Sequence, residues 1–279
     1  MNLKRYLKNI AKSILNKDVG NYTTVKVYTT APGEALMGKN IVITGGGRGL
    51  GYYIAKRSVA EGANVLITGR KEETLKNAVK ELGEKVKYIS FDIQNIEEIK
   101  NFFEMAEDRL GGKIDALVSN AGISLHEGNF RNVTEEGWDK QIDTNLKGNY
   151  FIVTEFIKYL ESKDDKSGNI VVMTSERAKR PDDIPYGLTK VATTSFIKGI
   201  ASKVIGEGIR INGVGPGVTA SDMTGFEKDG NLYASWQPTN RIFMPEEVAE
   251  VVNFLLSDVS ACINGEVITC DQGRYIVHW

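Results

Sequence analysis

Short apolar runs alternate with segments of helical periodicity along most of this chain. The apolar runs are expected to be strands, and they lie at residues 41–44, 65–68, 87–91, 116–119, 169–174 and 210–214. Several of them are continuously apolar, which is typical of parallel strands that are buried on both faces. Between them, apolar residues recur with helical spacing at residues 50–61, 72–82, 96–110, 135–160, 186–205 and 246–256.

This alternation predicts an α/β fold. A strand followed by a helix, repeated along the chain, gives right-handed crossovers and one parallel, doubly wound sheet with helices on both faces. No linker rich in Pro, Gly or Ser and no internal repeat interrupts the pattern. Residues 37–279 are therefore expected to form a single domain.

The first 36 residues follow a different pattern. In the first twenty of them, apolar residues recur at helical spacing and basic residues outnumber acidic ones, which predicts a basic amphipathic helix. Residues 22–30 are rich in Thr, Val and Tyr and predict an extended arm that ends at Pro32-Gly33. Three interpretations of the helix stay open: docking on the same or a neighbouring subunit, which we favour; weak contact of residues 1–17 with a membrane surface; and disorder.

The composition narrows the functional classes. Hydrophobic residues make up 41% of the chain, charged residues 25%, and the formal net charge is -1, so no nucleic-acid partner is expected. Cys262 and Cys270 belong to no CxxC or Cys/His cluster, and we expect no metal site. No apolar run approaches the ~18 residues of a membrane span, and the N-terminus lacks the apolar segment of a signal peptide. We expect a cytoplasmic protein.

Glycines are concentrated where the first expected strand gives way to the first helix. A tight turn there can need positive φ, and the backbone must come close to a pyrophosphate whose charge the helix N-terminus stabilises. The spacing is GxxxGxG rather than the commoner GxGxxG. We expect a dinucleotide site that includes Gly45, Gly47, Arg48, Gly49, Leu50 and Gly51.

The second expected strand indicates which dinucleotide binds. A carboxylate at its end would bind the ribose hydroxyls of NAD(H), but here the strand is followed by Gly69-Arg70-Lys71. A guanidinium can bind a 2′-phosphate through two charge-assisted hydrogen bonds. Arg70 and Arg48 therefore favour NADP(H) over NAD(H). In the alternative interpretation, Arg70 only caps a solvated loop and either cofactor is accepted.

Tyr186 and Lys190 are four residues apart, which places them on the same face of a helix. A free tyrosine has a pKa near ~10, too high for efficient proton exchange at neutral pH. A lysine cation stabilises phenolate, so Lys190 is expected to lower the pKa of Tyr186. The YxxxK pattern is common by chance and gains its meaning from the motifs around it.

Those motifs occur in a fixed order. Residues 44–51 read TGGGRGLG, residues 119–122 read SNAG, Asn145 lies in DTNL, Ser175 ends an apolar run, and Pro216-Gly217 follows the last expected strand. With Tyr186 and Lys190, this set resembles the short-chain dehydrogenase/reductase family, and within it the 3-oxoacyl-(acyl-carrier-protein) reductases. The resemblance covers about residues 37–279 and implies a Rossmann-type sheet.

The resemblance implies roles for four residues. Tyr186 would exchange a proton with the substrate oxygen as hydride moves to or from the nicotinamide. Ser175 would hydrogen-bond that oxygen, and Lys190 would hold the nicotinamide ribose and lower the pKa of Tyr186. Asn145 would help to hold a water that links Lys190 to solvent. The expected function is NADP(H)-dependent hydride transfer to or from a small-molecule carbonyl or secondary alcohol.

The resemblance also extends the cofactor site. Asp92 and Ile93 match the pair beside the adenine, although Asp92 could instead cap a helix. Further cofactor contacts are implied for Asn120, Ala121, Gly122, Pro216, Gly217 and Val218.

Three features depart from the family pattern. Ser119 stands where the family commonly has Asn, the stretch from Ser175 to Tyr186 is short and unusually charged, and the N-terminal extension has no counterpart. The substrate therefore stays open between a 3-oxoacyl thioester, a sugar or polyol, and a small ketone. Relatives suggest a homodimer or homotetramer. The rival hypothesis is a non-catalytic NADP(H)-binding redox sensor or regulatory protein.

Overall fold

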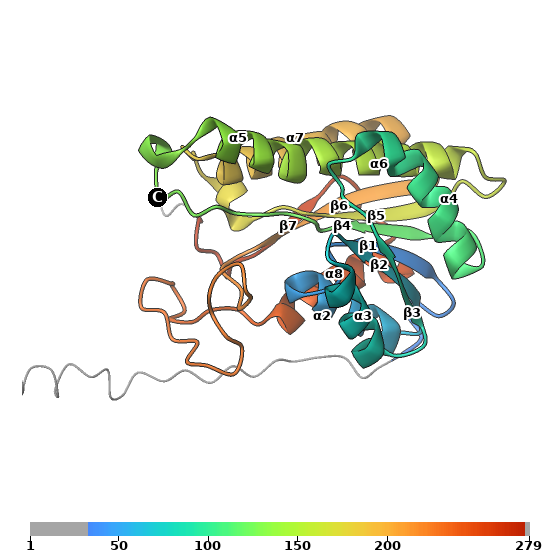
Figure 1. Cartoon of the computed structure of the whole chain (residues 1–279), viewed down its shortest axis with the longest axis horizontal. Helices are drawn as coiled ribbons and strands as arrows, with labels where there is room; N and C mark the ends of the chain where they lie inside the picture. The colour runs from blue at the N-terminus through green and yellow to red at the C-terminus, as the bar shows by residue number, and fades with distance from the viewer. Residues whose placement is uncertain (1–32, 277–279) are drawn as a thin grey trace, which may run out of the picture.

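A computed structural model of the chain describes residues 33–276 (Figure 1). The expected N-terminal helix and extended arm, with the three interpretations of that helix, lie outside the described residues. Within residues 33–276, no helix is long and apolar enough to cross a membrane.

Seven parallel strands form the centre of the described chain, in the order β3-β2-β1-β4-β5-β6-β7. Their bounds are β1 Asn40–Thr44, β2 Asn64–Gly69, β3 Val86–Ser90, β4 Ala116–Ser119, β5 Gly168–Met173, β6 Ile209–Pro216 and β7 Val267–Cys270. The longer helices are α2 Gly49–Ala60, α3 Glu72–Leu82, α4 Ile99–Leu110, α5 Glu135–Ile142, α6 Asn149–Glu161, α7 Pro185–Val204 and α8 Pro245–Leu256.

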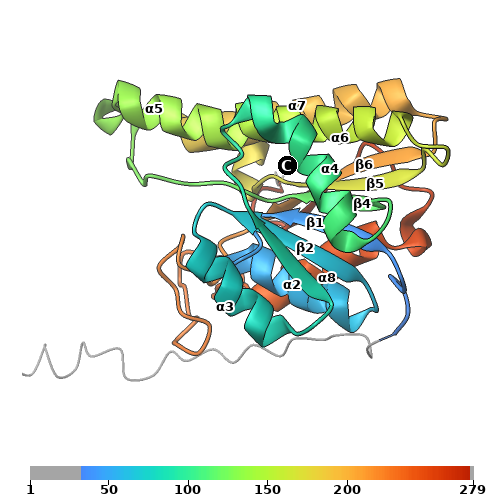
Figure 2. The same ribbon diagram turned by 45° about the vertical axis from the view of Figure 1, so that its right-hand side comes forward.

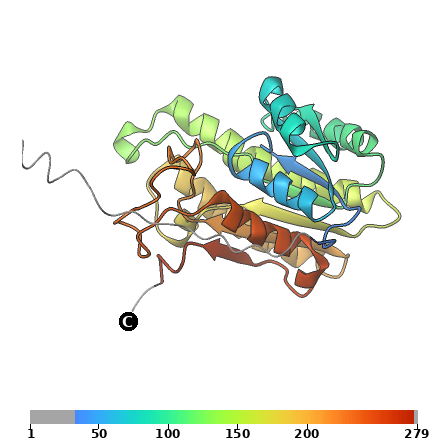
Figure 3. The same ribbon diagram turned by 90° about the horizontal axis from the view of Figure 1, so that it is seen from below.

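Helices cover both faces of the sheet (Figures 1 and 2). Successive side chains of a strand point to opposite faces, so β1 sends Val42 to one core and Ile41 and Ile43 to the other. Val42 packs with residues of α4, α6 and α7, including Phe102 and Phe156. The opposite core contains residues of α2, α3 and α8, and Figure 3 shows α2 and α8 side by side beneath the sheet.

The predicted doubly wound sheet is confirmed, and two details differ from the prediction. The seventh strand, β7, was not predicted; it lies half-buried at the sheet edge. The helix expected at 135–160 is divided by a six-residue π-helical segment, η3, Asp143–Gly148. Apolar periodicity indicates a buried helical face but does not reveal such a local change in winding.

The carboxyl ends of β1, β4, β5 and β6 lie at the same edge of the sheet because the strands are parallel. In open α/β sheets, ligands bind in the crevice outside the carboxyl ends of the strands, where the strand order reverses. Here the order reverses between β1 and β4. The candidate site is built at this edge.

Candidate active site

The glycine turn joins the carboxyl end of β1 to the first residue of α2. Gly45 and Gly49 have φ of +66° and +53°, which favour glycine over residues with a side chain. A Cβ at Gly51 would overlap the carbonyl oxygen of Gly45, so no larger residue fits that position. No side chain caps the N-terminus of α2. The turn therefore presents close-packed backbone at a helix N-terminus, which suits a pyrophosphate.

The SNAG turn after β4 lies directly against the glycine turn. The Thr44 hydroxyl accepts hydrogen bonds from the backbone N–H groups of Asn120 and Ala121, at 2.9 and 3.0 Å. The Asn120 side chain donates to the carbonyl oxygens of Thr44 and Gly45, at 2.9 and 3.2 Å. These bonds hold the two predicted cofactor turns together as one surface.

Ser119, the departure from the family's asparagine, has a buried partner of its own. Its hydroxyl donates to Asn149 Oδ1 at 2.5 Å. The Asn149 side-chain amide donates in turn to the carbonyl oxygens of Ala121, Thr144 and Asn145. Ser119 and Asn149 thus connect the SNAG turn to the π-helical segment η3.

Asn145 lies in η3, and its side chain is fully buried. Its Nδ2 donates to the Ile123 carbonyl and its Oδ1 accepts from the Ile123 N–H, both at 2.8 Å. Both groups of the amide are therefore used to fix the chain beyond Gly122. The predicted role of Asn145 in holding a water stays a prediction.

Ser175 and Tyr186 meet where β5 ends and α7 begins. The Ser175 side chain lies close enough to the Tyr186 hydroxyl for hydrogen bonding to oppose the rise that burial causes in the Tyr186 pKa. The Ser175 hydroxyl accepts a hydrogen bond from the Arg177 N–H at 3.2 Å. On the next turn of α7, Lys190 Nζ donates to the Met173 carbonyl at 3.0 Å and lies 5.7 Å from the centre of the Tyr186 ring. The predicted Tyr and Lys share one face of a helix.

Gly122 brings Asn145 and Lys190 into the same place. A Cβ at Gly122 would lie 3.4 Å from Asn145 Oδ1 and 3.8 Å from Lys190 Nζ. The structure therefore assembles all four side chains expected from the sequence, Asn145, Ser175, Tyr186 and Lys190, next to the SNAG turn.

Burial has the largest effect on the pKa values of Tyr186 and Lys190. Burial raises the pKa of Tyr186, and the hydrogen bond from Ser175 only partly offsets this effect. Burial lowers the pKa of Lys190 to about 8. The direction for Tyr186 is opposite to the expected lowering of its pKa by Lys190, because desolvation of the phenolate outweighs the favourable charges around it.

The two arginines expected at the cofactor ribose both lie beside the glycine turn, and both face carboxylates. Arg48 forms an ion pair with Asp222 at 3.2 Å, and the Arg70 guanidinium lies 4.0 Å from the Asp92 carboxylate. Asp92 also accepts a hydrogen bond from the Gln94 N–H at 3.0 Å. It closes this local turn and does not cap a helix, so the alternative interpretation of Asp92 is wrong.

The other expected cofactor residues divide between the core and the loop after β6. Ile93 is buried in the core with α4 and α6. Pro216 ends β6, and the Gly217 N–H donates to the Cys270 carbonyl at 2.9 Å. Val218 then packs on a small apolar cluster that belongs to the loop after β6, formed by Ala220, Leu232, Ala234 and Ile242.

Comparison with known proteins matches most of the chain. The family described as "Enoyl-(Acyl carrier protein) reductase" matches residues 45–274. The 3-oxoacyl-[acyl-carrier-protein] reductase FabG of Chlamydia muridarum is 34% identical over 246 residues, which cover 85% of this chain and 98% of that protein. The short chain dehydrogenase claC of Passalora fulva is 32% identical over 265 residues, or 87% of this chain and 96% of that one.

A solved structure agrees with these relatives. The 3-ketoacyl-(acyl-carrier-protein) reductase from Brucella melitensis, complexed with NADH, superposes with a TM-score of 0.79 at 28% identity. It covers 86% of this chain and 100% of its own. The chain belongs to the short-chain dehydrogenase/reductase family. It is an NAD(P)-dependent enzyme of that family, and the rival interpretation as a non-catalytic sensor is not favoured.

Sequence reasoning missed several residues of this short-chain dehydrogenase/reductase site. The charged loop after Ser175 contains Arg177, which forms a two-point ion pair with Asp182 at 2.5 and 2.6 Å. It also contains Glu176, which is buried and pairs with Arg274 at 2.7 Å. The density of charge in residues 176–183 was the available signal, but the partners could not be inferred from it.

Glu176 connects the end of β5 to the C-terminal part of the described chain. Burial raises the pKa of its carboxyl group, although the guanidinium of Arg274 opposes that effect. The Arg274 guanidinium also lies 5.0 Å from the Trp236 ring and 5.3 Å from the Tyr275 ring. Three segments of the short-chain dehydrogenase/reductase fold therefore converge on Arg274: the loop after β5, the loop after β6, and the segment after β7.

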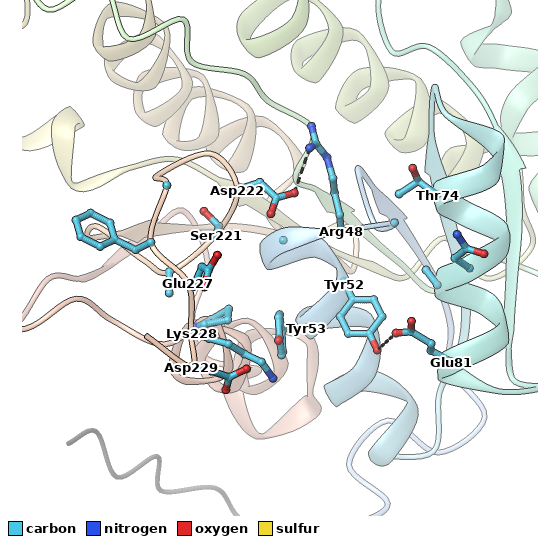
Figure 4. Close-up of a pocket in the computed structure, with 18 residues that line it drawn as sticks. Arg48, Tyr52, Tyr53, Thr74, Glu81, Ser221, Asp222, Glu227, Lys228 and Asp229 are labelled. Atoms are coloured by element: carbon cyan, nitrogen blue, oxygen red, sulfur yellow. Dashed lines mark hydrogen bonds and ion pairs between the residues drawn. The ribbon is translucent and has the colours of Figure 1, made fainter. Parts of the chain in front are cut away.

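Two hollows lie near the glycine turn and the end of β2. One has a volume of about 660 Å³ and lies between the glycine turn, α2, α3 and residues 220–229 (Figure 4). In Figure 4, Tyr52 points toward Glu81, and their hydrogen bond measures 2.9 Å. A second hollow of about 610 Å³ is bordered by Arg70, Gln94 and α5. Neither is lined by Ser175, Tyr186 or Lys190.

Proposed function

We propose that this enzyme transfers hydride between NADP(H) and a carbonyl or secondary-alcohol substrate, with Tyr186 as the general acid/base. The observation that carries the proposal is the convergence of Ser175 and Lys190 on Tyr186. Hydrogen bonding from Ser175 opposes the rise that burial causes in the pKa of Tyr186, and the Lys190 ammonium lies 5.7 Å from the centre of the Tyr186 ring.

The residues around the glycine turn fit the proposed cofactor. The turn has no room for a Cβ at Gly51, as expected where backbone must approach a pyrophosphate. Arg48 and Arg70 carry no buried ion pair, since their side chains are 70% and 53% exposed. Surface ion pairs contribute about 0–1 kcal/mol, so a 2′-phosphate could replace their carboxylate partners at little cost.

Each side chain has a role in the proposed reaction. NADPH, when bound, supplies the hydride. The Ser175 hydroxyl orients the substrate carbonyl by a hydrogen bond to its oxygen, and the Tyr186 hydroxyl gives its proton to that oxygen as the C–H bond forms. Lys190 stabilises the phenolate that results, and Asn145 holds the chain segment that follows the SNAG turn. In the reverse direction, phenolate accepts the proton of the alcohol.

The substrate that we place first is a 3-oxoacyl thioester. FabG relatives are named for 3-oxoacyl-[acyl-carrier-protein] reduction, and they match 85% of this chain. We assign the loop after β6 to the substrate side, because it carries the apolar and aromatic residues Met223, Phe226, Tyr233 and Trp236. Keto-sugars or polyols and small ketones are the alternatives, because the charged loop after Ser175 distinguishes this chain from the family pattern.

We propose a homodimer or homotetramer as the functional form. Large apolar side chains are exposed on α6 and α7, namely Tyr150, Phe151, Leu188 and Val191. Exposed apolar surface of this kind marks association surfaces. Light scattering on the purified protein tests the assignment, and a monomer at micromolar concentration would contradict it.

The function is tested by NADPH oxidation with acetoacetyl thioesters, keto-sugars and small diketones. Tyr186→Phe should reduce the rate at least about 100-fold, since general acid catalysis contributes about 10²–10⁴-fold. The Kd for NADPH should change little. Tyr88→Phe removes the same hydroxyl from a half-buried tyrosine on β3, where it bonds the exposed side chain of Glu72, and is the matched control. Retention of the rate by Tyr186→Phe would overturn the assignment.

A further inference from the structure

The loop from Ser175 to Tyr186 folds back so that two of its charges lie next to each other. The 3₁₀ turn η4, Glu176–Lys179, places Arg177 toward α7, and an extended stretch returns the chain to Asp182. Arg177 Nε and Nη2 lie 2.5 and 2.6 Å from the two oxygens of the Asp182 carboxylate. The Arg177 guanidinium also lies 6.0 Å from the centre of the Tyr186 ring.

Asp182 is also held by the residue that precedes α7. Its side chain is fully buried, and its Oδ1 also accepts a hydrogen bond from the Ile184 N–H at 3.3 Å. A Cβ at Gly187 would overlap the Asp182 carboxyl carbon, so the glycine next to Tyr186 makes room for this carboxylate. A cation and an anion are thus held in fixed geometry beside Tyr186.

We propose that Arg177 and Asp182 are a pair of positioning residues that hold Tyr186 in place and set the proton affinity of its hydroxyl by opposite charges. The chemical consequence rests on the proposed function, because it matters only if Tyr186 is the acid/base. The electrostatic part can be measured without turnover. The short charged loop that departs from the family pattern thereby acquires a role.

The groups that face Tyr186 come from two segments. In the loop after β5, the Ser175 hydrogen bond and the Arg177 charge lower the pKa of Tyr186, whereas the charges of Glu176 and Asp182 raise it. In α7, Lys190 lies beside the ring. Because Arg177 and Asp182 act in opposite directions, removing either charge alone should shift the pKa of Tyr186, and removing both should largely restore it.

The direct test measures Tyr186 itself. Phenolate absorbance is titrated over the alkaline range in which each protein stays folded by circular dichroism, and the curve of the matching Tyr186→Phe protein is subtracted. Arg177→Gln should shift the titration upward by about one pH unit and Asp182→Asn downward by about one, or tenfold in the dissociation constant. The double variant should lie between them. Lys163→Gln removes a half-buried ion pair with Glu107, far from Tyr186, and is the control.

Activity gives a second readout. For alcohol oxidation the phenolate is the active form, so kcat/KM rises with pH through the pKa of Tyr186. The pH at which kcat/KM rises should be higher in Arg177→Gln and lower in Asp182→Asn. Arg177→Lys keeps the positive charge, so its rise of kcat/KM should stay at the wild-type pH. This variant serves as the second test if Arg177→Gln folds poorly.

The outcomes separate the inference from the proposed function. Opposite shifts of the two single variants support the charge pair, because damage to the fold would not move the titration in two directions. Equal shifts in the same direction, or none, would overturn it. Opposite shifts in absorbance combined with a Tyr186→Phe protein that keeps full activity would leave the electrostatic pair in place and refute the proposed function.

Discussion

The Arg48 guanidinium lies 3.2 Å from the Asp222 carboxylate, so an ion pair joins the glycine turn to the loop after β6. Both side chains are about 70% exposed, and their hydrogen bond is drawn in Figure 4. An exposed pair of this kind is screened by salt and contributes little to stability. Asp222 therefore competes only weakly for an arginine that we assign to the 2′-phosphate of NADP(H).

Replacement of these arginines should change cofactor preference. Arg48→Gln and Arg70→Gln are each expected to raise the Kd for NADPH about tenfold and to leave the Kd for NADH nearly unchanged, since charge-assisted hydrogen bonds to an ion contribute about 1.5–3 kcal/mol. Asp222→Asn removes the competitor and should tighten NADPH binding slightly. Fluorescence titration of the reduced cofactors measures both constants. Equal weakening for NADH and NADPH would contradict a role at the 2′-phosphate.

Because Gly51 lies close to the Gly45 carbonyl, alanine should be harmful at position 51 although it is tolerated at an open glycine elsewhere. Gly51→Ala would force a methyl group against the Gly45 carbonyl and should displace the glycine turn, with loss of cofactor binding. Gly199 lies in α7 with open space around it, and Gly199→Ala should raise the free energy of unfolding by about 0.5–1 kcal/mol. Thermal unfolding and NADPH titration of the two variants check the contrast. Normal cofactor binding by Gly51→Ala would show that the turn can relax.

Asn145 should be needed for stability as well as for the reaction. Asn145→Ala leaves the Ile123 N–H and C=O groups without their partner, which costs about 1–3 kcal/mol for each buried group that stays unpaired. Urea denaturation measures the loss. Asn132→Ala removes an exposed asparagine side chain that bonds the Glu127 carbonyl, and its effect should be much smaller. Similar losses in the two variants would mean that the Ile123 contacts contribute little.

The lowered pKa of Lys190 should make the stability of the folded protein depend on pH. Its pKa is lowered by burial from 10.5 to about 8, so between these values the unfolded chain holds a proton that the folded protein has lost. The free energy of unfolding should therefore rise with pH in this window, by about 1.4 kcal/mol per pH unit relative to Lys190→Met. Lys198→Met, on the exposed side of α7, should keep the wild-type slope. Parallel slopes for wild type and Lys190→Met would contradict the shift.

The sheet could be predicted from the sequence because its strands are buried on both faces. The run at residues 116–119 is entirely apolar or small, and β4 has these same bounds. β7, Val267–Cys270, is as apolar as β4, but it is only half-buried and lies at the edge, where a single neighbouring strand constrains it. The π-helical winding around Asn145 follows from tertiary contacts, chiefly those of Asn145 with Ile123 and of Asn149 with the SNAG turn.

In the site, too, some features could be predicted from the sequence and others depend on the folded structure. Tyr186 and Lys190 were predictable because helical spacing alone places them on one face. The direction of the Tyr186 pKa was not, since it depends on how completely the loop after β5 excludes water. The pairing of Arg177 with Asp182 required the path of that loop and the space left by Gly187. A sequence shows that a loop is charged, but it does not show which charges meet.

The central pairing of the sheet joins strands that are far apart in the chain. β1 pairs with β4, with Ile41 opposite Ala116, whereas β1, β2 and β3 are near neighbours in sequence and contain the glycine turn. Pairings between strands that are distant in sequence form late, because closing the long intervening loop costs conformational entropy before the strands make stabilising contacts. On the ribosome, where N-terminal portions emerge first, the half with the glycine turn can therefore assemble before Ser175, Tyr186 and Lys190 are available. The nascent chain would acquire its dinucleotide-binding half before it acquires the groups that move the proton.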